Sequence, residues 1–188
     1  MHSLASFENL FKEIFKGYET YFVRLLTFEE AKRLIHKPLE GTQITFSDEA
    51  VKKIFEFCGG RPMEIYLFCS ALMEKFSKDR ICKSLYSSED IDRLTKKEIF
   101  QLEESFHLVI LNYQRIYDYA MSDEERAIIN SLIKAGKIPV SYISPDLIQS
   151  LIDTGLVIKG DDNNYRINGE LFKLVLSEQN YVLANPKN

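Results

Sequence analysis

Apolar residues at helical spacing, interrupted by glycine and proline, divide most of the chain into short amphipathic helices. The apolar positions recur every three or four residues, which is the period of one face of a helix. Several segments begin at Ser or Thr followed by acidic residues and end at glycine or proline, as helices commonly do. Thr27 and Glu30, for example, have the spacing of a capping box. The pattern predicts helices over residues 4–15, 27–37, 47–58, 62–76, 88–94, 122–136, 144–155 and 169–177, and one long helix or a bent pair over 96–119.

The predicted helix that begins at Pro62 is apolar around most of its circumference. A helix of this kind is normally buried by neighbours on several sides, so we expect it at the centre of a small helical domain. Gly59 and Gly60 allow a sharp turn before it, and Pro62 suits its first turn. Arg61 is therefore held at the helix entrance. There it is either a cation that meets an anionic ligand or a solvated arginine with no such role.

Residues 18–26 differ from this helical pattern because they are rich in aromatic and β-branched side chains. This composition predicts a β-strand. The rest of the first hundred residues is predicted to form helices with no sheet of their own, apart from a short extended piece over 42–46. A single strand cannot make a stable sheet. The strand therefore either pairs with the same strand of another copy or belongs to a sheet whose other strands lie outside this chain.

The second half of the chain has the element order of a winged helix. After the predicted helices over 96–119, 122–136 and 144–155, the residues 156–158 and 165–167 flank a Gly-Asp-Asp-Asn-Asn turn, which signals a β-hairpin. Three helices followed by a two-stranded wing is a variant of helix-turn-helix. The sequence thus predicts a mainly α protein with three parts: an isolated helix–strand remnant (1–26), a helical bundle (27–95) and a winged-helix domain (96–188).

Composition places the chain among ordinary soluble proteins, with 45% hydrophobic and 28% charged residues. No apolar run approaches the ~18 residues that a membrane helix needs, and the first residues lack the order of a signal peptide. The three cysteines form no C-x-x-C pair. We expect buried free thiols, no metal site and a cytoplasmic location.

Charge is distributed unequally between the two halves of the chain. Residues 1–99 carry 16 basic and 16 acidic side chains, whereas residues 100–188 carry 8 basic and 12 acidic ones. DNA-binding modules usually present a basic face, yet the helix in the recognition position, 144–154, has no Lys or Arg. Of the residue types that read base edges, only Gln149 is present in it. Binding by another face would draw on Lys134 and Lys137, so we interpret the winged helix as a protein-contact or autoinhibitory module.

Three features together resemble the C-terminal half of a STAND or AAA+ P-loop ATPase, with the archaeal-type members most similar. These features are the segment L-L-T-F-E-E-A-K-R-L-I-H-K-P-L-E-G, the helix after G-G-R-P, and the winged helix. The resemblance covers nearly the whole chain and implies a helical lid over 27–95, preceded by the last helix and strand of an ATPase core. It also implies that Gly60, Arg61 and Pro62 form the family's G-x-P motif, in which Pro62 would touch the base and Arg61 would sense the phosphates.

The sequence departs from such ATPases in its catalytic elements. It contains no G-x-x-x-x-G-K-[ST], the loop that holds the phosphates of a nucleotide. It also has no apolar strand that ends in paired acids to hold Mg²⁺. No Ser or Cys has a His or an acid at a spacing typical of nucleophilic catalysis. We therefore expect no catalytic residues and no ATP hydrolysis by this chain, with ATP and Mg²⁺ as cofactors only of a complete parent protein.

Two functions of different class remain open from the sequence. The first is a non-catalytic lid and winged-helix portion of an ATPase, either a fragment or a degenerate paralogue, which senses nucleotide and couples it to a partner. Its partners would be the ATPase core and, through the edge of the 18–26 strand, a second copy of the chain. The second function is a stand-alone winged-helix DNA-binding transcriptional regulator.

Overall fold

The computed structural model describes residues 24–78, 83–95 and 104–184 of the chain, which are mainly helical with a few short strands. Contacts between residues group them into two compact units, one over 24–111 and one that begins at Asn112. The predicted helix over 4–15 and most of the predicted strand over 18–26 lie outside the described residues. The last residues of that strand, 24–26, are described and form no strand pairing.

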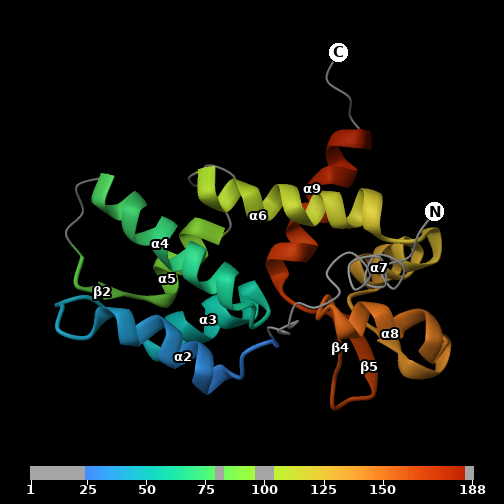
Figure 1. Ribbon diagram of the computed structural model, residues 1–188, viewed down its shortest axis with the longest axis horizontal. Helices are drawn as coiled ribbons and strands as arrows, with labels where there is room; N and C mark the ends of the chain where they lie inside the picture. The colour runs from blue at the N-terminus through green and yellow to red at the C-terminus, as the bar shows by residue number, and fades with distance from the viewer. Residues whose placement is uncertain (1–23, 79–82, 96–103, 185–188) are drawn as a thin grey trace, which may run out of the picture. The chain divides into compact units, whose positions relative to one another are not determined.

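The first unit is built from short helices that pack side by side (Figure 1). Its elements are α2 (Phe28–His36), the 3₁₀ turn η1 (Lys37–Leu39), β1 (Thr45–Phe46), α3 (Asp48–Cys58), α4 (Pro62–Lys78), β2 (Leu85–Tyr86) and α5 (Ser88–Arg93). A further helix, α6 (Glu104–Arg115), crosses the boundary between the two units.

Capping interactions fix where these helices begin and end, as the sequence predicted. The Thr27 hydroxyl accepts from the Glu30 amide, and the Glu30 carboxylate accepts from the Thr27 amide, which completes the capping box before α2. The Ser47 hydroxyl accepts from the Ala50 amide and so caps the N-terminus of α3. Gly59 ends α3 in a left-handed conformation, which a residue without Cβ adopts readily.

The helix α4 is central to the first unit, which confirms the prediction from its apolar circumference. Its side chains at Ile65, Phe68 and Leu72 are completely buried. They pack with residues of α2 and α3, both of which contact α4. Phe68 lies against Phe57 of α3 with ring centroids 5.3 Å apart. Burial of several large apolar side chains in one helix is the main source of stability for a domain of this size.

The prediction that the first unit has no sheet of its own is wrong. Strands β1 and β2 pair in parallel, with Phe46 opposite Tyr86, although 40 positions separate the two residues. The rings of Phe46 and Tyr86 stack with centroids 4.9 Å apart, and Phe76 of α4 meets Tyr86 edge-on. Each strand has only two residues, so neither produces the alternating pattern that would reveal it in the sequence.

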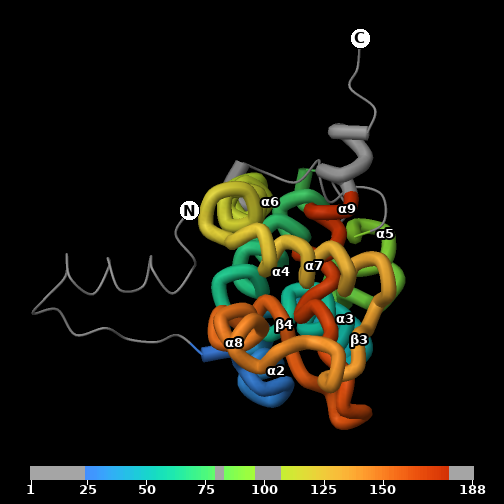
Figure 2. Tube along the Cα trace, turned by 90° about the vertical axis from the view of Figure 1, so that its right-hand side faces the viewer, coloured from blue at the N-terminus to red at the C-terminus, as the bar shows by residue number. Residues whose placement is uncertain are grey.

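The second unit contains three short strands among its helices. After the π-helical turn η4 (Ile116–Ala120) its elements are α7 (Asp123–Ala135), β3 (Ile138–Pro139), the 3₁₀ turn η5 (Val140–Tyr142), α8 (Pro145–Asp153), β4 (Val157–Lys159), β5 (Asn164–Ile167) and α9 (Glu170–Ala184). Figure 2 shows α7, α8 and β4 near one another, and α8 contacts both of the others.

The predicted hairpin over 156–167 is confirmed, because β4 and β5 pair antiparallel around the expected turn. The strand β3 was not predicted, and it pairs with the other edge of β5 to give the order β3-β5-β4. The core of this unit includes Ile129, Ile148 and Phe172, all fully buried. Tyr113 lies against Phe172 with ring centroids 4.9 Å apart.

Candidate functional site

The turn between α3 and α4 is joined to the segment that precedes α2. The Leu26 amide donates to the Gly60 carbonyl oxygen at 2.8 Å. Gly60 has φ +71°, and a Cβ built on it would lie 2.9 Å from the Leu26 carbonyl oxygen. A glycine is therefore required at this close approach of two backbones. As a result, Leu26 and Pro62 lie on the same face of the unit, although they are far apart in the sequence.

Beside this turn lies an open groove with a volume of about 710 Å³. Four of its lining residues, Leu26, Leu34, Pro38 and Pro62, are apolar, and the other three are Glu30, Arg33 and Lys37. Apolar walls with a few charged groups are typical of small-molecule sites. Pro62 of the predicted motif thus faces a space that a ligand could enter.

Glu30 is the one acidic residue of the groove lining, and its charge is compensated locally. Its carboxylate accepts from the Thr27 amide at 2.9 Å and from the Arg24 guanidinium at 2.5 Å. The Thr27 amide and then the Arg24 side chain lower the pKa of Glu30 to about 2. The carboxylate is therefore ionised at neutral pH and paired with Arg24. The remaining charges of the groove, Arg33 and Lys37, are both exposed and positive.

Arg61 does not line this groove. Its guanidinium donates to the Cys58 carbonyl oxygen at 3.1 Å, and its Nε lies 3.7 Å from Oε1 of Glu64. The side chain is only 13% exposed, and Glu64 is buried. In this structure Arg61 is thus neither a solvated surface arginine nor a cation directed at the groove. It joins the end of α3 to the first turn of α4.

The two thiols of the first unit that the structure describes, Cys58 and Cys69, are buried and unreactive, and Cys82 lies outside the described residues. Cys69 lines a smaller apolar cavity of about 130 Å³ under α2 and α4, and burial raises the pKa of its thiol to about 12. Burial also raises the pKa of Cys58 far above its ordinary value. Both thiols are protonated at neutral pH and are poor nucleophiles. Among the described residues, no group of His, Cys, Asp and Glu is arranged to hold a metal ion.

The three candidate DNA contacts lie in the second unit, and the structure does not gather them into a basic patch. Lys134 is exposed near the end of α7. The Lys137 ammonium lies 3.1 Å from the Asp162 carboxylate, and the Gln149 amide donates to Asp153 at 2.7 Å. The Asp162 carboxylate also binds Arg166 at 2.5 Å. Two of the three candidates are thus occupied by carboxylates of their own unit.

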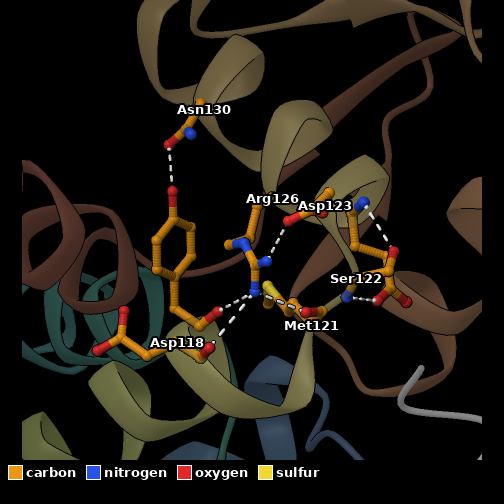
Figure 3. A network of polar contacts seen from close by, with 8 residues as sticks. Asp118, Met121, Ser122, Asp123, Arg126 and Asn130 are labelled. Carbon is orange, nitrogen blue, oxygen red and sulfur yellow. Dashed lines mark hydrogen bonds and ion pairs between the residues drawn. The ribbon is translucent and has the colours of Figure 1, made fainter. Parts of the chain in front are cut away.

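A polar network around Arg126 was not predicted from the sequence (Figure 3). The Arg126 guanidinium donates to the carbonyl oxygens of Tyr117 and Asp118 within η4 and to that of Met121 just after it, the nearest at 2.7 Å. It also forms an ion pair with Asp123. The Tyr117 hydroxyl donates to Asn130 at 2.9 Å. An arginine in the first turn of a helix has no local signal that it will satisfy the carbonyl oxygens before that helix. The network fixes η4 against α7.

No family model matches this sequence, and no curated protein matches it significantly. In the part of the chain that the structure describes, every helix is too short or too polar to cross a bilayer.

Proposed function

We propose that this chain is the non-catalytic lid and winged-helix portion of an AAA+ or STAND-type P-loop ATPase. The observation that supports the proposal most directly is the backbone hydrogen bond from the Leu26 amide to the Gly60 carbonyl oxygen. It holds Leu26, two residues before α2, beside the Gly-Arg-Pro turn, so that Leu26 and Pro62 line one open groove. A nucleotide base fits against such an apolar wall, while an ATPase core that is not part of this sequence would supply the P-loop contacts to its phosphates.

The second unit supports the same proposal through its element order. A helix, a short strand, a second helix and a hairpin follow one another, with the first strand added to the edge of the hairpin. This order is typical of a winged helix. In the proposed protein the winged helix receives the change of nucleotide state from the lid and passes it to a partner. ATP and Mg²⁺ would be cofactors of the complete protein.

The proposal is tested by titrating the chain with adenosine and following backbone amide shifts by NMR. We expect saturable shifts, at millimolar concentrations, at Leu26, Leu34 and the residues next to Pro62, and none in 123–177. Pro62→Ala should weaken these shifts, because it removes part of the apolar wall. Met63→Ala is the matched control, since Met63 is 67% exposed and does not line the groove. Absence of saturable shifts at the groove would contradict the proposal.

The alternative is a stand-alone DNA-binding regulator, and the winged-helix order of the second unit favours it. The charges of that unit disfavour it, because Asp162 holds Lys137 and Arg166, and α8 carries only acidic charges. Fluorescence anisotropy with a labelled DNA duplex separates the two functions. Micromolar binding that weakens with salt and with Lys134→Gln/Lys137→Gln would support the regulator.

A further inference from the structure

We propose that Arg33 and Lys37, rather than Arg61, are the cations of this chain that contact the phosphates of a nucleotide bound in the groove. This inference rests on the proposed function and adds which cations of this chain meet the phosphates of the nucleotide. It assigns the anion contacts to α2 and η1, outside the Gly-Arg-Pro motif.

Arg33 and Lys37 lie side by side along the groove and are available to an external anion. They are four residues apart, so their side chains leave the same face of consecutive turns. Both line the groove, as do Leu34 and Pro38 between and beside them. The ion pairs found among the described residues of this unit include Lys32 with Asp48 and Lys53 with Asp92, and they leave Arg33 and Lys37 without a carboxylate partner. Both cations are therefore free to meet an external anion.

Arg61 is held away from the groove by contacts within its own turn. To reach a ligand in the groove, its guanidinium would leave the Cys58 carbonyl oxygen and the Glu64 carboxylate. Glu64 is buried, and removal of the cation from a buried ion pair is strongly unfavourable because it leaves an uncompensated charge. Arg33 and Lys37 can bind an anion without breaking any contact of this kind.

The form of the groove decides the ligand class. Its apolar residues suit a flat ring, and its two exposed cations suit a chain of phosphates, whereas the acidic Glu30 is already paired with Arg24. A free anion would leave the apolar walls unused, and an uncharged ring would leave the cations unused.

Basic residues in the last turn of a helix also complement the helix dipole, so the experiment needs a readout that this structural role does not move. That readout is the dependence of affinity on phosphate number. The chain is titrated by NMR with adenosine, AMP, ADP, ATP and tripolyphosphate. We expect affinity to rise from adenosine to ATP at the groove residues. In Arg33→Gln/Lys37→Gln the affinity for ATP should fall at least about tenfold, to nearly that of adenosine.

Two controls accompany this variant. Lys52→Gln/Lys159→Gln removes the same charge from exposed positions outside the groove and should leave the phosphate dependence intact. Arg61→Lys, which keeps the buried cation, should also leave it intact. If phosphate dependence persists in Arg33→Gln/Lys37→Gln, or if no phosphate dependence is found in the unmodified chain, the inference is overturned. In either case adenosine shifts that are sensitive to Pro62→Ala would leave the proposed function standing. Tripolyphosphate binding through Arg33 and Lys37 without adenosine binding would instead contradict the proposed function.

Discussion

The two units differ in the positive charges that surround their candidate sites. In the first unit, Arg33 and Lys37 are exposed along an open groove whose single carboxylate is paired with another arginine. In the second unit, Lys137 and Arg166 share the Asp162 carboxylate, and Arg126 is surrounded by carbonyl oxygens and Asp123. Among the described residues, an external anion would therefore meet two cations without an ion pair, Arg33 and Lys37, at the groove of the first unit. Near Asp162 and Asp123 of the second unit it would meet cations that already have partners.

This difference indicates that the net charge of each half of the chain does not predict where an anion would bind. By composition, the first 99 residues are neutral and the rest carry the whole net charge of −4. The difference depends instead on whether the cations at each candidate site already form ion pairs with carboxylates of the chain. It favours an anionic ligand at the groove of the first unit over DNA at the second unit, because each paired cation would first have to break an existing contact.

The largest expected effect on stability comes from Gly60→Ala, which adds a side chain to the turn beside the groove. The new Cβ would lie 2.9 Å from the Leu26 carbonyl oxygen, on a residue with φ +71°. We expect the free energy of unfolding of the chain to fall by about 2–4 kcal/mol, from backbone strain and overpacking together. Urea unfolding measures this change. Hydrogen exchange should accelerate most at the Leu26 amide, which donates to Gly60.

The matched control is Gly41→Ala. Gly41 also has positive φ, at +81°, but no atom lies within 4 Å of a Cβ built there. Its cost should be only that of a left-handed alanine, about 1 kcal/mol. Equal destabilisation by the two variants would show that the contact with Leu26 contributes nothing, and the groove would lose its structural basis.

An intermediate effect is expected from Arg126→Ala in the second unit. The substitution removes the donor that satisfies the Met121, Tyr117 and Asp118 carbonyl oxygens (Figure 3). We expect a loss of about 2 kcal/mol, because several partly buried acceptors lose a charged donor at once. Urea unfolding gives the magnitude, and hydrogen exchange over 116–121 gives the location.

Arg126→Lys sharpens this test, since an ammonium keeps the charge but lacks the planar fork of a guanidinium. It should recover only part of the stability. Full recovery would mean that the network acts through charge alone, as a simple partner for Asp123, and not by holding the end of η4.

The helices and the hairpin could be predicted because each has local signals. The capping box at Thr27, the glycine at 59 and the turn around 160–164 determine their boundaries through interactions only a few residues long. The β1–β2 pair and β3 could not be predicted, because two-residue strands have no pattern of their own and depend on distant partners.

The site was predicted only in part, for a similar reason. Pro62 was identified from its motif, and the structure places it in a groove. The groove itself depends on the approach of Leu26 to Gly60, which no local pattern encodes. The orientation of Arg61 depends on the burial of Glu64, so a motif could not show that its guanidinium is held away from the groove. Arg33 and Lys37 have helical spacing, but only the fold shows that they share a groove with Pro62.

The smallest expected effect concerns the carboxylate that neutralises the cations of the second unit. The Lys137 ammonium, followed by Asn164 and Arg166, lowers the pKa of Asp162 to about 2 from an ordinary value of 3.8. A carboxylate whose pKa is depressed in the folded state stabilises the fold above its unfolded pKa, and this stabilisation is lost as the pH falls through the folded value. The stability difference between the unmodified chain and Asp162→Asn should therefore be constant above about pH 4 and should decline between about pH 4 and pH 2.

Thermal unfolding across that pH range measures the difference, with Asp161→Asn as the control because Asp161 forms none of the ion pairs of this turn. The Asp162→Asn variant also tests the contrast between the units. Once Asp162 is neutral, Lys137 and Arg166 are released, and the second unit should gain weak, salt-sensitive affinity for a DNA duplex. If Asp162→Asn changes neither the acid dependence nor the DNA affinity, the cations of the second unit are not restrained by this carboxylate. The preference for an anion at the first unit would then need a different cause.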